Sequence, residues 1–369
     1  MCGIVGLYCL DNTLNREEAA HEVETMAKSL YHRGPDSNGL WQDPDISLSI
    51  GHQRLSILDL SARGHQPMVS TSGRYVLSYN GEIYNSPDIS DEMSAHNINL
   101  KGRSDTEVLL AALEHWGPAS TLQKINGMFA FSLWDRKRKL LHFARDRMGK
   151  KPLYFGWAGQ KTLLFASELK AFHKSGCFEK EIDPNALKQF LHFGYVPAPL
   201  CIFKNIISLP PGCWATLELP SLTAGQDLSA FIQTYWDRNQ IVEQTHLSFE
   251  TLKPSEMENQ PENLLKNAVS SRLASDVPLG SFLSGGLDSS LVTAMAAEKS
   301  RTTLDTFTIG FEENQYDEAS HANEVANYIG TRHHEHTLTA KEALDIIPIL
   351  PEMYDEPFAD PSQIPTYLI

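Results

Sequence analysis

The sequence predicts two domains of different fold class: an α+β domain built on stacked sheets, followed by an α/β domain built on a parallel sheet. Strand-like runs dominate up to about residue 217, with few helical segments between them. Residues from about 220 to 260 are polar and irregular. After Pro261, short apolar strands alternate with helices, which is typical of right-handed βαβ units. We therefore expect a first domain over 2–217, a connector over 218–260 and a second domain over 261–369.

The first domain is predicted to be mainly β, with two clear helices. Apolar residues at helical spacing predict a helix over 17–30. Ser104, with Glu107 three residues later, predicts a capping box that opens a helix whose apolar stripe runs to Trp116. The predicted strands share apolar, aromatic or β-branched side chains; they cover 3–10, 46–50, 54–58, 75–79, 129–134, 140–144, 153–157, 162–166 and parts of 206–217.

The second domain is predicted to alternate strands with helices. Parallel strands need crossover connections of this kind, and their carboxyl ends then share one edge of the sheet. The expected elements are a helix over 262–273, a strand over 279–283, a helix through Ala297, a strand over 304–311, a helix over 318–329 closed by Gly330, a strand over 334–338 and a helix over 341–350.

Composition restricts the class of function. A formal net charge of −15 argues against sequence-independent binding to nucleic acid or to an anionic membrane. No run approaches the ~18 apolar residues of a membrane span, and the N-terminus lacks the basic region of a signal peptide. The five cysteines are widely spaced, with no C-x-x-C pair, which fits a reducing compartment. We expect a cytoplasmic protein whose partners are small molecules.

Cys2 is the candidate nucleophile, once Met1 has been removed. A terminal cysteine carries nucleophile and base on one residue, because its own α-amino group, with a pKa of about 7.7 to 8, can accept the thiol proton. No separate histidine is then required. Gly3 and Gly6 would let a backbone or a substrate approach closely. The alternative is a buried structural cysteine in a first strand.

A second candidate site is the stretch Ser284 to Ser290, which reads Ser-Gly-Gly-Leu-Asp-Ser-Ser and lies between a predicted strand and a predicted helix. Its glycines expose backbone N–H groups, the helix N-terminus adds positive potential, and three hydroxyls can donate to phosphate oxygens. No Gly-Lys-Ser/Thr follows, so the stretch is not a Walker A loop. It predicts a pyrophosphate site; a Ser/Gly turn with an N-cap is the alternative.

This stretch closely resembles the PP-loop of ATP pyrophosphatases, which adenylate a carboxyl or carbonyl oxygen and release pyrophosphate. Together with Cys2-Gly3-Ile4, it resembles the family of glutamine-hydrolysing asparagine synthetases over essentially the whole chain. The resemblance implies a first domain of the N-terminal-nucleophile hydrolase type, with αββα layers, and a PP-loop nucleotide domain after it. It also implies a ligase: ammonia from glutamine aminates a β-aspartyl adenylate made from aspartate and ATP with Mg²⁺. A homodimer is left possible.

The resemblance assigns the chemistry of glutamine hydrolysis to three residues. Cys2 would form a γ-glutamyl thioester, while the Asn80 side chain and the Gly81 backbone N–H would form the oxyanion hole. From spacing alone, Asn80-Gly81 between apolar strands predicts a type I′ hairpin turn. Both interpretations can hold, because a rigid turn can fix donors aimed at a developing oxyanion.

Substrate binding is assigned in the same way. Arg54, in an otherwise strand-like stretch, would hold the α-carboxylate of glutamine in a bidentate pair; a structural salt bridge is the alternative. Asp105 would bind the α-amino group, with Glu82 placed near that ammonium. The helix dipole would also favour a carboxylate at Asp105 without any function.

In the second domain, the resemblance places adenine contacts at Leu283 and Ile309, with Gly310 beside them. A cation that bridges phosphates usually has one or two carboxylate ligands, so Asp288 would be a Mg²⁺ ligand. The pyrophosphate would be held by Ser284, Gly285, Gly286, Leu287, Asp288, Ser289 and Ser290. On a strand, His334 and His336 share a face that His333 does not, and zinc is not expected there.

The chain departs from the family pattern at its end. The family carries a second acidic signature, SG-E/D-G-x-D-E, on a later strand, and this sequence ends at Ile369 before it. We expect a fragment or a truncated product, in which glutamine hydrolysis is uncoupled from amide transfer. Two further segments, 33–36 and 145–154, resemble family segments and are assigned to loop structure and the domain interface.

Two other functions are compatible with the same residues. The first is an amidotransferase that aminates a different carboxylate, such as a polysaccharide or antibiotic precursor. The second is an incomplete remnant that binds glutamine or ATP as a regulator. Amidotransferases that aminate sugars are disfavoured, because their second domains lack the PP-loop.

Overall fold

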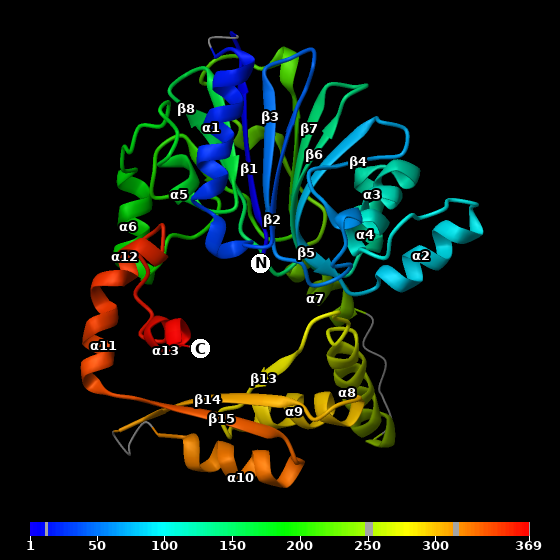
Figure 1. Cartoon of the computed structure of the whole chain (residues 1–369), viewed down its shortest axis with the longest axis vertical. Helices are drawn as coiled ribbons and strands as arrows, with labels where there is room; N and C mark the ends of the chain where they lie inside the picture. The colour runs from blue at the N-terminus through cyan, green and yellow to red at the C-terminus, as the bar shows by residue number, and fades with distance from the viewer. Residues whose placement is uncertain (12–13, 248–253, 313–316, 369) are drawn as a thin grey trace. The chain divides into compact units, whose positions relative to one another are not determined.

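The chain forms two compact units (Figure 1). The computed structural model describes residues 1–11, 14–247, 254–312 and 317–368. The first unit comprises Met1–Thr245 together with Asp355–Phe358, and the second comprises His246–Tyr354 and Ala359–Ile369. The short segment 355–358 is held in the first unit by Glu356, whose carboxylate accepts from Ile202 N at 2.7 Å and from Tyr154 OH at 2.9 Å.

The first unit is built on two six-stranded sheets whose strand pairs are antiparallel. One sheet has the order β10-β8-β9-β1-β3-β2 and the other β12-β11-β7-β6-β5-β4. The strands are β1 Gly3–Cys9, β2 Ser37–Gln42, β3 Leu48–Arg54, β4 Met68–Val69, β5 Tyr75–Ile83, β6 Gly127–Asp135, β7 Leu140–Arg145, β8 Tyr154–Ala158, β9 Thr162–Ala166, β10 Ile206–Ser208, β11 Cys213–Glu218 and β12 Ile232–Thr234.

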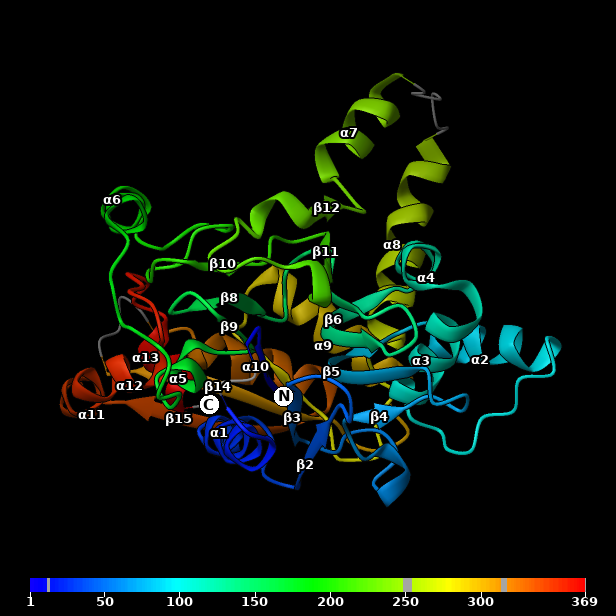
Figure 2. The same cartoon turned by 90° about the horizontal axis from the view of Figure 1, so that it is seen from above.

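Three buried apolar clusters define four layers in this unit. One cluster lies between the sheets and joins Ile4 and Ile50 of one sheet to Trp134 of the other. The second packs helix α1 against the outer face of the β1 sheet, and the third packs α3 against β5 (Figure 2). This is the αββα arrangement that the family resemblance implies. The helices of this part of the chain are α1 Arg16–Lys28, α2 Ser86–Ala95, α3 Asp105–Trp116, α4 Pro118–Lys124, α5 Leu169–Phe172, α6 Pro184–Phe193 and α7 Arg238–Leu247.

The predicted hairpin turn at Asn80-Gly81 is wrong. Both residues lie inside β5, where Asn80 pairs with Ala130 and Gly81 with Phe129 of β6. Position 81 requires a glycine, since a Cβ there would lie 2.3 Å from Met128 O. Tertiary pairing therefore overrides the local turn preference. The expected strand over 54–58 is also wrong, because β3 ends at Arg54. Strand β2 was not predicted from the sequence.

The predicted start of α3 is confirmed, although its cap differs in detail. Ser104 Oγ accepts the Glu107 N–H at 3.3 Å, as an N-cap should. The Glu107 carboxylate does not return to Ser104. It accepts instead from the backbone N–H groups of Lys101 and Gly102, each at 2.6 Å, and so orders the loop that precedes the helix.

The second unit has a parallel sheet of the order β13-β14-β15, as the alternating pattern predicts. The strands are β13 Gly280–Phe282, β14 Asp305–Phe311 and β15 Arg332–Leu338, and the helices are α8 Pro254–Ser270, α9 Leu287–Lys299, α10 Ala319–Ile329, α11 Ala340–Ile346, α12 Leu350–Met353 and α13 Gln363–Leu368. Within the expected connector, β12 and α7 are regular elements, and residues 248–253 lie outside the described residues. No helix in the described ranges is long and apolar enough to cross a membrane.

Candidate active site

All six predicted glutaminase residues line one cavity of about 310 Å³ in the first unit. They come from different elements: the residue before β1, the end of β3, the last third of β5 and the first turn of α3. The six are Cys2, Arg54, Asn80, Gly81, Glu82 and Asp105. The cavity is large enough for a small amino-acid substrate.

Cys2 lies just before β1 and is held by four hydrogen bonds, one of them from its Sγ to Leu55 O at 3.7 Å. Its backbone N donates to Asn80 Oδ1 at 3.0 Å, and its carbonyl accepts from Arg33 Nε at 2.8 Å. Leu55 N donates to the Cys2 Sγ at 3.4 Å, which favours a negative charge on sulfur. Gly3, expected to admit a substrate, instead makes room for Leu30, whose Cβ would lie 2.9 Å from an added Cβ.

The protonation states of the thiol and the terminal amine are complementary. Burial raises the pKa of the Cys2 thiol, so the thiol keeps its proton at neutral pH. Burial also lowers the pKa of the terminal ammonium, carried here by Met1, with Arg33 and Lys151 adding to the decrease. The same cavity thus favours a protonated thiol and a neutral amine, and removal of Met1 would give Cys2 an amine of its own in this environment.

Two donors beside Cys2 are placed for an oxyanion. The Asn80 Nδ2 is buried and has no hydrogen-bond partner among the described residues, although Oδ1 is engaged by Cys2 N. Tyr79 N and Ile83 N bond to side chains at the outer edge of β5, so the two-residue period of the strand directs the Gly81 N–H to the same edge. This arrangement can stabilise a developing negative charge on oxygen.

Arg54 is buried, and its guanidinium is oriented by backbone carbonyls. Its terminal nitrogens donate to Ser61 O at 3.0 Å and to Asp59 O at 2.6 Å. Within the described residues it forms no salt bridge, so the structural ion pair considered from the sequence is not observed. A guanidinium has five N–H donors, and those left over can pair with a carboxylate in the cavity.

Two carboxylates, Asp105 and Glu82, also line the cavity. Asp105 Oδ2 accepts from Tyr79 OH at 2.7 Å and from Ile83 N at 3.0 Å, which fixes its orientation. Burial raises the pKa of Asp105 and of Glu82, and for Glu82 the neighbouring Asp105 raises it further. Two partly desolvated carboxylates favour a cation between them, which the ammonium group of an amino acid can supply.

Sequence reasoning missed three residues of this site. Arg33, assigned to a loop, bonds the Cys2 carbonyl and pairs with Glu168. Tyr79 orients Asp105, and Lys151 lines the cavity although its segment was assigned to the domain interface. The sequence around Tyr79 gives no indication that its hydroxyl bonds to Asp105. A lysine after a turn is normally a solvated surface residue.

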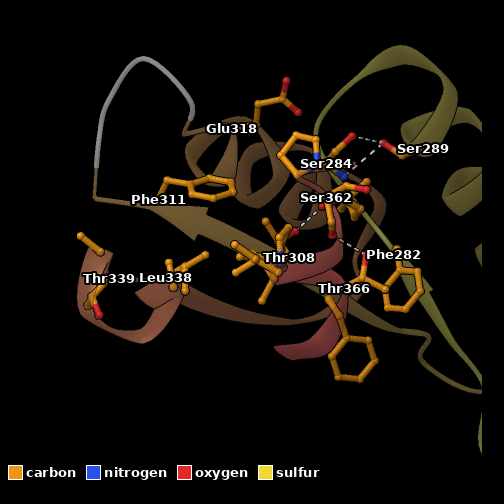
Figure 3. Close-up of a pocket in the computed structure, with 18 residues that line it drawn as sticks. Phe282, Ser284, Ser289, Thr308, Phe311, Glu318, Leu338, Thr339, Ser362 and Thr366 are labelled. Carbon is orange, nitrogen blue, oxygen red and sulfur yellow. Dashed lines mark hydrogen bonds between the residues drawn. The ribbon is translucent and has the colours of Figure 1, made fainter. Parts of the chain in front are cut away.

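The second unit contains a cavity of about 900 Å³ at the carboxyl ends of β13 and β14 (Figure 3). Ser284 and Ser289 lie together at one side of it, and Leu338 and Thr339 lie at the other. The wall between them is largely apolar, with Phe282, Leu283, Phe307, Ile309 and Phe311 among the lining residues. An apolar wall next to a hydroxyl-lined end suits a nucleotide, with the base on the wall and the phosphates at the hydroxyls.

The structure brings only part of the predicted nucleotide set into this cavity. Leu283, Ser284, Ser289 and Ile309 line it. Gly285, Gly286, Leu287, Asp288, Ser290 and Gly310 do not. Of the three hydroxyls predicted to donate to phosphate oxygens, that of Ser290 donates to Gly286 O at 2.7 Å, and those of Ser284 and Ser289 lie 3.0 Å apart.

The histidines of β15 have partners other than a metal. His334 Nε2 lies 2.8 Å from Asp305 Oδ1, and His336 Nε2 lies 3.5 Å from Glu342 Oε1. Across the residues that the structure describes, no group of three His, Cys, Asp or Glu side chains is arranged to hold a metal ion. Asp288 is exposed in the first turn of α9, where a single carboxylate fits a cation shared with phosphates.

Comparison with known proteins agrees with this geometry. The sequence model of a family described as "Glutamine amidotransferase domain" matches residues 1–236. A cavity with a terminal cysteine, an arginine and paired carboxylates thus lies in a glutamine amidotransferase domain. A second model, described as "Asparagine synthase", matches residues 260–369. The chain belongs to the family of glutamine-hydrolysing asparagine synthetases, as its two motifs predict.

Curated relatives match this chain over its whole length. A putative asparagine synthetase (glutamine-hydrolyzing) 2 of Methanocaldococcus jannaschii is 33% identical over 100% of this chain and 71% of its own length. Asparagine synthetase (glutamine-hydrolyzing) 1 of Bacillus subtilis is also 33% identical, over 100% of this chain and 55% of its own length. The chain thus spans little more than half of the Bacillus protein. Among solved structures, the glutamine phosphoribosylpyrophosphate amidotransferase of B. subtilis matches 90% of this chain and 65% of its own, with 17% identity and a TM-score of 0.46.

Proposed function

We propose that the first unit hydrolyses glutamine to glutamate and ammonia, with Cys2 as the nucleophile after removal of Met1. The observation that supports this most directly is the meeting of all six expected residues in one cavity. Within it, an unpartnered amide donor lies beside the thiol, and a buried guanidinium is present together with two carboxylates. Each group matches one part of glutamine: the side-chain amide, the α-carboxylate and the α-ammonium.

The proposed reaction begins with proton transfer from the Cys2 thiol to its own α-amine. The thiolate attacks the side-chain amide carbon of glutamine, and the Asn80 Nδ2 and Gly81 N–H donate to the oxyanion that forms. The C–N bond then breaks, and the leaving nitrogen takes the proton from the terminal ammonium and departs as ammonia. Water hydrolyses the resulting thioester, which releases glutamate and restores the thiol.

We further propose that the second unit binds ATP and activates aspartate, so that the ammonia yields asparagine, AMP and pyrophosphate. In this proposal Leu283 and Ile309 contact the base, while Ser284 and Ser289 donate to the phosphates. Asp288 and the phosphates would hold Mg²⁺, which would reduce the negative charge of the triphosphate when bound. A cytoplasmic location, a homodimer and the domain boundaries at 217 and 261 also stay predictions.

One experiment tests both halves. The purified chain is incubated with glutamine, and glutamate release is measured alongside mass spectrometry of the N-terminal peptide. We expect a chain that starts at Cys2 and a transient γ-glutamyl adduct on that residue.

ATP binding and the products formed from aspartate or other carboxylates are measured in parallel. Retention of Met1 in an active enzyme would contradict the proposed base, and amination of another carboxylate would replace aspartate as the acceptor.

Replacement of Asp105 by asparagine tests the proposed ammonium site. Asparagine can still accept from Tyr79 OH and Ile83 N, so the fold should persist. Loss of a charge-assisted hydrogen bond should lower kcat/KM for glutamine by about 10- to 100-fold, mainly through KM. Because burial raises the pKa of Asp105, wild-type KM should rise as the pH falls and this group protonates. Asp91→Asn, an exposed site on α2, serves as the control; equal KM values in the two variants would exclude the assignment.

Replacement of Gly285 by alanine tests the nucleotide loop. Gly285 has φ +77°, and a Cβ there would lie 2.7 Å from Ala322 N, so the loop must move. We expect ATP affinity, measured by calorimetry, to fall by at least ~10-fold, because the displaced loop no longer presents its hydroxyls to the phosphates; the left-handed strain itself, about 1–2 kcal/mol, lowers stability. Glutaminase activity should be unchanged. Gly330→Ala has a similar positive φ of +83° but nothing within 4 Å, and it separates backbone strain from damage to the site.

A further inference from the structure

Lys151 is a buried cation in the glutaminase cavity that the proposed chemistry does not use. The residue is 6% exposed and lines the cavity together with Cys2 and Glu82. In the described part of the chain, its ammonium group has neither a hydrogen-bonded nor an ion-paired partner. Most lysines point to bulk solvent, whereas this ammonium reaches the cavity: Nζ is not among the fully buried polar atoms that lack a partner. Its presence therefore calls for a role in the site.

The loop that carries Lys151 is held in place at almost every residue. The Asp146 carboxylate accepts backbone N–H groups from Phe129 at 3.1 Å and from Met148, Lys150 and Lys151, each at 3.0 Å. Arg145 adds donors to the carbonyls of Lys151 at 2.8 Å, Gly149 at 2.8 Å and Leu209 at 2.7 Å. Both backbone groups of Lys151 are thus fixed. The ammonium is presented to the cavity by a rigid turn, not by a mobile surface segment.

The charges around Lys151 are nearly balanced when its ammonium is included. Arg33 is neutralised by Glu168, which leaves Arg54 and Lys151 as cations and Glu82 and Asp105 as anions. The titratable and charged groups that line the cavity or act on it from the elements around it are the terminal amine, Cys2, Arg33, Arg54, Tyr79, Glu82, Asp105, Asp146 and Lys151 itself. Without Lys151 the cavity would be negative and would attract a proton.

We propose that Lys151 is a positioning residue that keeps the terminal amine free of its proton and keeps Glu82 ionised. The proposal rests on the glutaminase function proposed above. Lys151 lines the same cavity as Met1, Cys2 and Glu82. Its charge lowers the pKa of Glu82 and of the terminal amine, which belongs to Met1 in this structure. The same charge acts on the amine of Cys2 once Met1 has been removed. The amine must be neutral to take the thiol proton, and Glu82 must be charged to attract the substrate ammonium. One cation therefore favours the active form of the base and of a binding group.

The direction of the pH effect follows from these two shifts. Removal of the cation raises the pKa of the amine, so the amine stays protonated and inactive to a higher pH. It also raises the pKa of Glu82, so this carboxylate is neutral over more of the acid range. Both changes reduce kcat/KM on the acid side and leave the alkaline plateau unchanged.

The test is the pH dependence of glutaminase kcat/KM, from about pH 5.5 to 9.5, in wild type, Lys151→Met, Lys151→Arg and Lys150→Met. In Lys151→Met the acid limb of the pH profile should move to higher pH by about half a unit or more. At a pH below the midpoint of the limb, kcat/KM should then be roughly threefold lower than in wild type. Lys151→Arg should restore the wild-type limb. Lys150→Met should match wild type, because Lys150 is the neighbouring lysine but is exposed and does not line the cavity.

The rate of Cys2 alkylation by iodoacetamide gives a second measurement that needs no turnover. It should show the same displaced limb in Lys151→Met. An unchanged limb in both assays overturns the proposal, and so does a uniform rise in KM at every pH, which would make Lys151 a substrate contact. If Lys151→Met does not fold, Lys151→Gln carries the same expectation with a polar side chain. A wild-type chain without glutaminase activity but with a titrating Cys2 would instead reject the proposed function.

Discussion

Replacement of Cys2 by alanine is expected to abolish glutamine hydrolysis, with a loss of at least ~10⁴-fold in kcat. The thiol is the nucleophile of the proposed mechanism, and no other cysteine lines the cavity. Glutamine should still bind, because Arg54, Glu82 and Asp105 are untouched. The measurements are glutamate release and, separately, glutamine binding by calorimetry. Binding without turnover is the expected result.

Two comparisons make that experiment specific. Cys177→Ala removes another free, partly buried thiol that lies outside the cavity, and it should retain full activity. Cys2→Ser keeps the terminal amine and a weaker nucleophile, so a small residual rate is expected in place of none. If the chain synthesises an amide, added ammonia should support that synthesis in Cys2→Ala, because only the release of ammonia from glutamine is lost. Normal glutaminase activity in Cys2→Ala would remove the basis of the proposal.

The residues that gather at the proposed glutaminase site were more predictable from the sequence than the backbone that carries them. A motif specifies which residue types stand at which positions. It can therefore identify site residues even where the predicted secondary structure is wrong. Asn80-Gly81 illustrates this, since the expected turn is a strand, yet both residues reach the cavity. Pairing with β6 along Tyr75–Ile83 outweighs the turn preference of two residues. The donors are therefore fixed by a sheet and not by a hairpin.

Contacts between distant segments could not be predicted. The Cys2 environment depends on Arg33, Leu55 and Asn80, which the sheet brings together from well-separated parts of the chain. Lys151 is buried because Asp146 and Arg145 fold its loop inward, and nothing in the spacing of a Lys-Lys pair predicts burial. The nucleotide loop was predicted as a motif, but the direction of the Ser290 hydroxyl depends on a backbone carbonyl one turn away. Such details belong to the fold and not to the local sequence.

Asn80 is expected to have the second largest effect of any single replacement in this site. It has two functions that can be separated: Oδ1 accepts from Cys2 N at 3.0 Å, and the buried Nδ2 is left for the oxyanion. Asn80→Ala removes both. Asn80→Asp keeps an acceptor for the amine but has no N–H₂ donor at neutral pH.

Both variants should lose about 10²- to 10³-fold in kcat, because the missing donor stabilises the transition state and not the bound substrate. KM for glutamine should change little, in contrast to Asp105→Asn. The assay is performed at the pH optimum of each variant, since the charge in Asn80→Asp raises the pKa of the neighbouring amine. Asn38→Ala, an exposed asparagine on β2, is the control. A kcat for Asn80→Asp within a few-fold of wild type would assign the oxyanion to other donors and leave Asn80 as an anchor for the terminal amine.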